Sequence, residues 1–198
     1  LRTPLTRIRL RGEFIEDAGQ QARLFRDVDE MQAMIDGALS FFRDDASCED
    51  ITTFDLPGIL RTIINDFADQ NIIIEYSGPA RVIYQGRPFA LKRVFTNLVE
   101  NAVKYATPPS IVLSCTPEHY TIAISDAGPG IPDSLIGRVF EPYFRGDSSR
   151  NRETGVVGLA LTSARATVQA HSGTLTVRYR PDGGLAVRVD LPRRDETP

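Results

Sequence analysis

The sequence contains few cysteines and no excess of positive charge. Among its 198 residues are two cysteines, Cys48 and Cys115, which stand far apart and show no metal-ligand spacing. Two reduced thiols explain them better than a disulfide or a metal site. The formal net charge is -3. No basic face would therefore dominate the field of nucleic acid phosphates, and the charge argues against nucleic acid as the main partner.

Long apolar runs are also absent. No stretch has the length needed to cross a bilayer, and no signal peptide is present. Hydrophobic residues make up 41% and charged residues 25% of the chain, as in soluble globular proteins. Because the chain starts at Leu1 within a helical pattern, we expect it to be the soluble end of a longer protein.

Residues 1–45 are predicted to form a helical hairpin with a turn at residues 16–19. Apolar residues recur in both helices at the alternating steps of four and three that mark the seam of a coiled coil or four-helix bundle. A hairpin this short buries too little alone, so we expect a homodimer; packing against its own C-terminal domain is the alternative. The seam positions are Leu1, Leu5, Ile8, Gly12 and Ile15, then Leu24, Val28, Met31, Ile35, Ala38 and Phe42.

A polar linker at residues 46–50 precedes a mixed helix and strand pattern over residues 51–192 and a tail at 193–198. Antiparallel hairpins with helices to one side indicate an α+β sandwich, not a doubly wound parallel sheet. The segment 141–157 has almost no apolar period, which is typical of a functional lid or of disorder. Helices are expected at 56–68, 87–105, 133–139 and 158–171, and strands at 52–55, 72–76, 82–84, 111–115, 120–125, 173–179 and 185–191.

A polar stripe on the helix 87–105 is the first candidate site. Because positions three and four apart share a helix face, one side carries two carboxamides, a lysine and a phenol, with an acid beside them. Carboxamide oxygens suit Mg²⁺, and lysine suits phosphate. An ordinary amphipathic helix is the alternative. The stripe consists of Asn97, Asn101, Lys104 and Tyr105, with Glu100 beside it, and the packing side carries Val94, Leu98 and Ala102.

Three weaker motifs follow. Asp126, with Gly128 and Gly130, ends a predicted strand; glycines let a backbone approach a flat ligand, and the carboxylate can accept a hydrogen bond from an exocyclic amine. An ordinary turn is the alternative. The aromatic stretch 140–147 suits a lid hinge with a phosphate contact, or a solvated loop pinned by aromatic packing. Residues 154–160 lead into a helix, whose first amides can bind phosphate.

The order of these four motifs resembles the ATP-binding domain of sensor histidine kinases, within the gyrase, Hsp90, histidine kinase and MutL superfamily. The resemblance covers about residues 51–192. Residues 1–10 also resemble the stretch that follows the phospho-accepting histidine in class I, EnvZ-like kinases. The implied fold is α+β: half of a dimeric four-helix bundle for dimerisation and phosphotransfer, then a Bergerat-type α/β sandwich.

The resemblance also implies roles for individual residues. Asn97 and Asn101 match the family's N box, with Asn101 as the Mg²⁺ ligand, and Glu100 would polarise the attacking imidazole or serve helix packing. Thr3 matches the position that orients water when such kinases dephosphorylate a response regulator, although a polar residue there needs no catalysis. The positions that would contact ATP are Lys104, Tyr105, Asp126, Gly128, Gly130, Phe144, Arg145, Arg150, Gly155, Gly158 and Leu159.

The sequence departs from the family pattern twice. The phospho-accepting histidine would precede Leu1, and neither His119 nor His171 lies on the hairpin of helices. Thr154 and Val156 stand where the family has glycines. Because β-branched residues resist positive φ, we expect weaker triphosphate binding or a misplaced lid.

The implied function is the cytoplasmic catalytic core of a bacterial inner-membrane sensor histidine kinase. It would use ATP and Mg²⁺ to phosphorylate a histidine and relay the phosphate to an aspartate of a response regulator receiver domain. One alternative is a kinase-impaired nucleotide-binding module that acts as a response-regulator phosphatase or scaffold. Another is an Hsp90-like or gyrase-like ATPase clamp, against which the helical hairpin and residues 1–10 argue.

Overall fold

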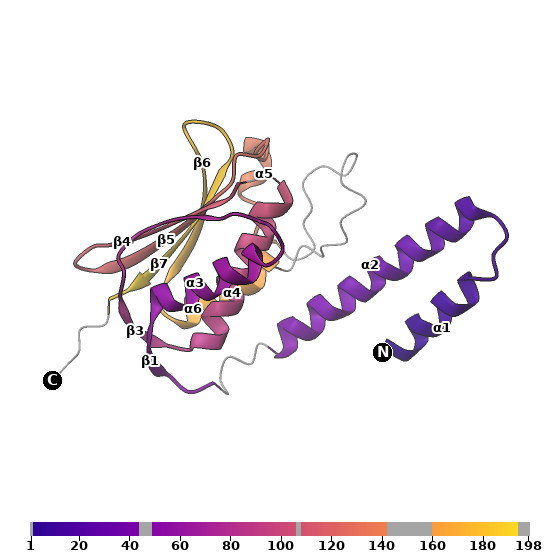
Figure 1. The fold of residues 1–198 in the computed structure, drawn as a ribbon, viewed down its shortest axis with the longest axis horizontal. Coiled ribbons are helices and arrows are strands. Elements are labelled where there is room, and N and C mark those ends of the chain that lie inside the picture. The colour runs from indigo at the N-terminus through magenta and orange to yellow at the C-terminus, as the bar shows by residue number, and fades with distance from the viewer. Residues whose placement is uncertain (1, 44–48, 106–107, 142–159, 194–198) are drawn as a thin grey trace.

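The computed structural model describes residues 2–43, 49–105, 108–141 and 160–193, which form a helical hairpin and an α/β sandwich (Figure 1). The helices are α1 (Arg2–Gly12), α2 (Ala18–Arg43), α3 (Leu56–Ala68), α4 (Pro88–Tyr105), α5 (Asp133–Ile136) and α6 (Ala160–Ala170). The strands are β1 (Thr52–Asp55), β2 (Glu75–Ser77), β3 (Ile83–Gly86), β4 (Ser110–Cys115), β5 (His119–Ser125), β6 (Thr174–Tyr179) and β7 (Leu185–Pro192).

The hairpin of α1 and α2 turns earlier than the sequence predicted. Asp17 Oδ1 accepts hydrogen bonds from the backbone N–H groups of Gly19 (2.7 Å) and Gln20 (3.0 Å). An aspartate in this position caps a helix start, so α2 already begins at Ala18. The turn therefore lies before residue 18, and not at residues 16–19.

The predicted apolar seam explains the close approach of the two helices. Leu5 and Val28 are buried, with exposed fractions of 6% and 4%. A Cβ atom built on Gly12 would lie only 2.6 Å from Cε1 of Phe25, so the glycine at this seam position lets the helices pack. Met31 belongs to the same seam but remains exposed.

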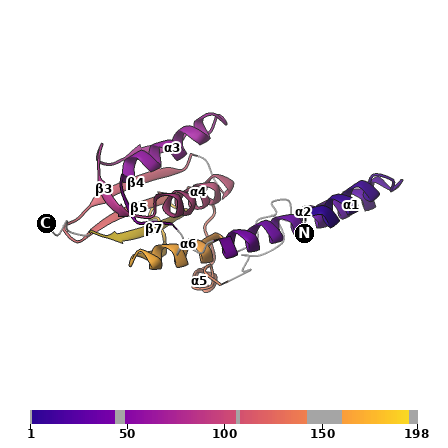
Figure 2. The same ribbon diagram turned by 90° about the horizontal axis from the view of Figure 1, so that it is seen from below.

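The sandwich is built on a five-stranded sheet in the order β2-β4-β5-β7-β6, with a separate two-stranded sheet of β1 and β3. All neighbouring strands are antiparallel except β2 and β4. Figure 2 shows α3, α4 and α6 in a row beside the sheet, and α4 packs against both of its neighbours. The α+β sandwich predicted from the sequence is confirmed.

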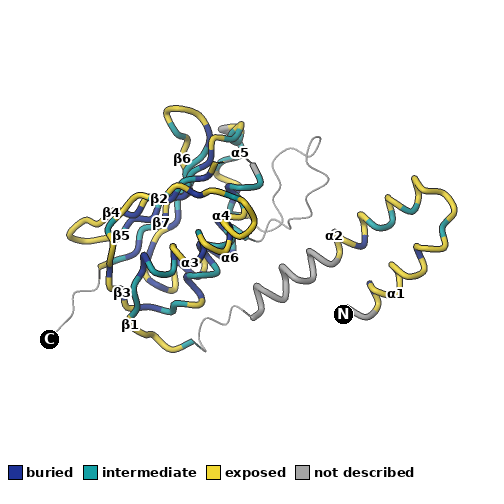
Figure 3. The backbone as a smooth tube through the Cα atoms, viewed as in Figure 1, coloured by how far each residue is buried: buried dark blue, intermediate teal, exposed yellow. Residues whose placement is uncertain are grey.

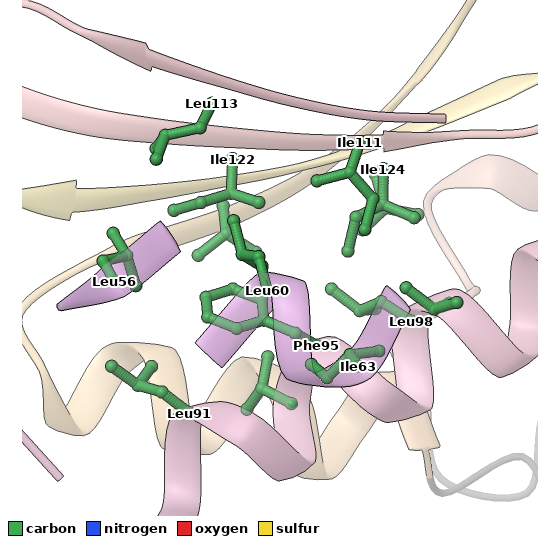
Figure 4. Close-up of a cluster of buried hydrophobic side chains, with 14 of the residues drawn as sticks. Leu56, Leu60, Ile63, Leu91, Phe95, Leu98, Ile111, Leu113, Ile122 and Ile124 are labelled. Atoms are coloured by element: carbon green, nitrogen blue, oxygen red, sulfur yellow. The ribbon is translucent and has the colours of Figure 1, made fainter. Parts of the chain in front are cut away.

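The core lies between this helix row and the large sheet. Figure 3 shows the burial concentrated in the sandwich, while the described part of the hairpin is mostly exposed. Figure 4 shows apolar side chains from both layers meeting, and each such large side chain contributes about 1.5–3 kcal/mol by leaving water. These include Leu60 and Ile63 of α3, Phe95 and Leu98 of α4, and Ile111, Ile122 and Ile124 of the sheet.

Most predicted boundaries agree with the structure to within two residues, but one strand and one helix each lose three residues at one end. The strand expected at 72–76 starts only at Glu75. Asn71 has φ of 62°, and the N–H of Ile72 donates back to Phe67 O (3.1 Å). This left-handed closure of α3 uses Ile72, the first residue that the β-branched pattern assigned to a strand. The helix expected at 133–139 ends at Ile136.

A buried histidine, His171, links the end of α6 to the residue before α4 through hydrogen bonds. His171 follows α6 and is 2% exposed. Its Nδ1 lies 2.8 Å from Thr167 O, and its Nε2 accepts the N–H of Arg87 (3.0 Å). Because Nε2 acts as an acceptor, the imidazole is held in its neutral form. None of the helices in the described ranges has the length and apolar character of a membrane span.

Candidate functional site

The polar stripe predicted on α4 lies along the last turns of that helix. Asn97, Asn101 and Lys104 are each half-buried, in positions that share one helix face. Tyr105 ends the helix, and its side chain lies outside the described residues. The packing side is confirmed, because Val94, Leu98 and Ala102 are 2%, 1% and 4% exposed. The helix therefore presents a partly covered polar wall backed by the core.

Glu100 stands beside this stripe and is perturbed by its surroundings. The residue as a whole is exposed, but partial burial of the carboxyl raises the pKa of Glu100 above its ordinary value. Perturbed pKa values are enriched at functional sites, which makes Glu100 a candidate functional residue.

The first turn of α4 is held by Glu49, a residue of the predicted linker at 46–50. Glu49 accepts hydrogen bonds from the backbone N–H groups of Phe89 (2.8 Å) and Ala90 (2.9 Å). Arg87 Nε donates to the carbonyl oxygen of Glu49 (2.9 Å). A carboxylate at a helix start satisfies free N–H groups and the helix dipole. No periodic signal links positions 40 residues apart, so the pattern could not reveal this contact.

Asp126 closes β5, as predicted, and is buried at 6% exposure. Its Oδ1 accepts the backbone N–H of Gly128 (2.8 Å), which shapes the loop that follows. Gly130 has φ of 75°, the left-handed conformation that the two-glycine motif predicted. An ionised carboxylate can accept about four hydrogen bonds, so Asp126 retains capacity for a ligand's donor.

Helix α6 holds the start of the aromatic stretch. Thr162 Oγ1 donates to the carbonyl oxygen of Phe140 (2.9 Å), and the Arg165 guanidinium lies over the Phe140 ring, 5.0 Å from its centre. These contacts bring Phe140 and α6 together across the segment 142–159.

Several predicted site residues lie outside the part of the chain that the structure describes. The side chain of Thr3, which lies in α1, is outside the described residues. The whole segment 142–159 also lies outside them, including the aromatic and glycine-loop positions Phe144, Arg145, Arg150, Thr154, Gly155, Val156, Gly158 and Leu159.

The donor set on α4 fits a magnesium ion that is held largely by a ligand. In the described ranges, no three His, Cys, Asp or Glu residues gather as a metal cluster. Mg²⁺ does not need such a cluster, because it keeps several waters and takes phosphate oxygens with one or two protein ligands. The half-buried carboxamide of Asn101 is a suitable single oxygen ligand.

Comparison with known proteins identifies the family. Residues 86–195, more than half of the chain, match the family described as histidine kinase-, DNA gyrase B-, and HSP90-like ATPase. The chain belongs to this family, and within it to the sensor histidine kinases. The family resemblance read from the motif order is thereby confirmed.

Individual relatives agree. Sensor histidine kinase GtrS of Pseudomonas aeruginosa is 38% identical over 194 residues, which are 98% of this chain and 40% of GtrS. The chain thus spans well under half of that relative's length. Mycobacterial sensor histidine kinase MprB superposes with a TM-score of 0.61 at 26% identity, over 73% of this chain and 99% of that one. The histidine kinase domain of Escherichia coli EnvZ superposes with a TM-score of 0.56 at 28% identity, over 74% of this chain and 93% of that one.

Proposed function

We propose that this chain is the ATP-binding and phosphotransfer core of a two-component sensor. Mg²⁺-ATP would bind between the polar wall of α4 and the loop that begins at Asp126. The observation that carries the proposal is the buried Asp126 carboxylate at the end of β5, in a sandwich whose family is an ATPase family. The half-buried stripe on α4 supports the same site.

The two walls would divide the nucleotide between them. Asp126 would accept a hydrogen bond from the adenine amine, with Gly128 and Gly130 allowing close approach of the base. Asn101, with Asn97 one turn earlier, would hold Mg²⁺, which neutralises phosphate charge when bound. The remaining contacts would come from Lys104 and Tyr105 and, beyond the described residues, from Phe144, Arg145, Arg150, Gly155, Gly158 and Leu159.

The reaction would be an in-line transfer to a histidine that lies outside this sequence. The imidazole nitrogen forms a bond to the γ-phosphorus while the bond to the ADP oxygen breaks. Glu100, whose pKa is raised by partial burial, would polarise the imidazole. The phosphoryl group then passes to an aspartate of a response regulator, and Thr3 would orient the water that later removes it.

The hairpin of α1 and α2 would pair with a second copy. Leu10, Phe14 and Met31 are 55%, 86% and 48% exposed. A second hairpin that completes a four-helix bundle would remove such apolar surface from water. This homodimer is the arrangement that the heptad seam predicts.

Asp126→Asn tests the nucleotide site. The asparagine keeps an oxygen for the N–H of Gly128 but replaces the second acceptor with a donor. We expect ATP affinity to fall about tenfold or more, while inosine triphosphate, which has an oxo group in place of the amine, is relatively favoured. Calorimetric titration of both nucleotides measures this. Unchanged ATP affinity and selectivity in Asp126→Asn would contradict the proposed site.

Label transfer tests the reaction. A partner chain that carries a phospho-accepting histidine is mixed with this chain and γ-labelled ATP, and the purified regulator is added afterwards. We expect label on the histidine and then on the regulator. ATP hydrolysis without transfer to histidine would favour a clamp-type ATPase instead.

The sequence of the glycine loop favours a second candidate, a kinase-impaired module that serves as a regulator phosphatase or scaffold. Thr154 and Val156 occupy positions where the family has glycines. Regulator dephosphorylation without histidine labelling would support this candidate. A Val156→Gly change that leaves ATP affinity and labelling unaltered would contradict an impaired loop.

A further inference from the structure

The loop that begins at Asp126 is fixed by a turn far away in the sequence. The β6–β7 hairpin closes through residues 180–184, with the N–H of Arg180 donating to Gly184 O and the N–H of Gly183 donating to Arg180 O (both 3.1 Å). Both backbone groups of Asp126 bind this hairpin. Its N–H donates to Leu185 O (2.9 Å), and its carbonyl oxygen accepts a hydrogen bond from Arg180 Nη1 (3.1 Å).

Gly184 brings the two backbones into direct contact. The residue is buried and has φ of 84°. A methyl group built on it would overlap the carbonyl oxygen of Asp126 and lie 2.9 Å from Cα of Ala127. Backbone atoms cannot move aside as the end of a flexible side chain can, so any larger residue here must push the turn and the start of the loop apart.

Gly183 provides a natural contrast one position earlier. Its φ of 90° is as unfavourable for a side chain as that of Gly184. A Cβ atom on Gly183, however, would meet nothing within 4 Å. The two glycines therefore share the conformational demand of the turn, while only Gly184 touches Asp126.

The far end of the same loop is held by the strand that enters the turn. The Tyr179 hydroxyl donates to the carbonyl oxygen of Ile131. A Cβ atom on Gly130 would lie 3.6 Å from Cε1 of Tyr179. The end of β6 and its turn thus bind the loop at Asp126 and at Ile131, and Tyr179 lies beside Gly130.

We propose that Arg180 and Gly184 are positioning residues that set the place of the Asp126 carboxylate and thereby the selectivity of the site for adenine. The inference rests on the proposed function, because it takes Asp126 as the group that reads the base. Neither residue needs to touch the nucleotide. Hydrogen bonds weaken steeply when they are misaligned, so a displaced Asp126 carboxylate would bind the adenine amine less well.

The test compares matched variants of the full chain in titrations with ATP and with inosine triphosphate, alongside thermal melting. We expect Gly184→Ala to lose about tenfold or more in ATP affinity and to bring the ratio of the two affinities towards one. Gly183→Ala should keep the ratio of the original protein, even if the strained turn lowers its melting temperature.

Arg180→Met, with the exposed Arg178→Met as its control, provides the second comparison. Arg180→Met removes the hydrogen bond to the Asp126 carbonyl oxygen without straining the backbone. This variant therefore remains informative if Gly184→Ala does not fold. We expect a smaller loss of selectivity than in Gly184→Ala, with partial recovery in Arg180→Lys, which restores a donor.

The outcomes distinguish the positioning role of Arg180 and Gly184 from the reading role of Asp126. If the ratio of ATP affinity to inosine triphosphate affinity in Gly184→Ala, Gly183→Ala and Arg180→Met equals that of the original protein, the positioning role is overturned. The proposed function is then left intact. Absence of any preference for ATP in the unchanged chain overturns the reading role of Asp126, and the inference with it.

Discussion

The two walls of the candidate nucleotide site are held in place by different means. The α4 wall is fixed from behind, because the helix buries an apolar side that includes Val94 and Leu98 in the core. The Asp126 loop is fixed through its backbone, by hydrogen bonds and close contact with the β6–β7 turn. One wall therefore depends on non-directional packing and the other on directional contacts.

This difference predicts how each wall fails. Loss of packing behind α4 reduces the stability of the whole sandwich, since α4 lies between α3 and α6. A change in the β6–β7 turn displaces a short loop while the core persists. Damage to the first wall should appear mainly as unfolding, and damage to the second mainly as lost selectivity.

Leu98→Ala should have the largest effect on stability. The side chain is 1% exposed within the core, and replacements of this kind cost about 2–5 kcal/mol. Denaturant unfolding measures the loss. The preference for ATP over inosine triphosphate should survive in the folded fraction, because Leu98 lies on the packing side of α4 within the core.

Ile73→Ala serves as the control for this variant. Ile73 is 77% exposed, so its change should lie within about 0.5 kcal/mol. A loss of selectivity in Leu98→Ala as large as that in Gly184→Ala would show that the two walls are not held independently.

The same difference decides what the sequence could reveal. The polar stripe and packing side of α4 followed from helical period, since contacts three and four residues apart leave a repeating pattern. The position of Asp126 after a strand and the left-handed Gly130 followed from local turn chemistry. These local predictions agree with the structure.

Contacts at long sequence separation left no such pattern. Arg180 and Asp126 stand 54 residues apart, and β1 pairs with β3 although α3 and β2 lie between them. Glu49 was assigned to a linker by its polar neighbours, yet it binds the first turn of α4. The predicted turn at 16–19 is wrong because Asp17 caps α2, which begins at Ala18.

Glu49→Ala should have an intermediate effect and act on the α4 wall from its far end. The variant leaves the N–H groups of Phe89 and Ala90 without their carboxylate. Loss of such a cap costs about 0.5–2 kcal/mol, and Glu49→Gln, which keeps an oxygen acceptor but not the charge, should lose less. Hydrogen exchange at these two amides, measured beside global unfolding, locates the effect. Unchanged exchange at both amides would argue against the cap.

Glu100→Gln should have the smallest effect and probes the exposed edge of the α4 wall. Partial burial raises the pKa of Glu100, so the folded protein binds this proton more tightly than the unfolded chain. The stabilisation that protonation of Glu100 contributes is therefore complete below the ordinary glutamate pKa of about 4.3. It is lost as pH rises through the pKa that Glu100 has in the folded protein. At pH 7 the glutamine variant should melt at the same temperature as the original protein or slightly higher.

Melting of both proteins at pH 7 and below the ordinary glutamate pKa checks the sign. An advantage of Glu100→Gln at pH 7 should disappear in acid, where both side chains are neutral. A variant that is less stable at pH 7 and equal in acid would mean that an attractive partner lowers the pKa of Glu100. In that case the carboxylate is a structural part of the α4 wall, and the case for its acting on an imidazole is lost.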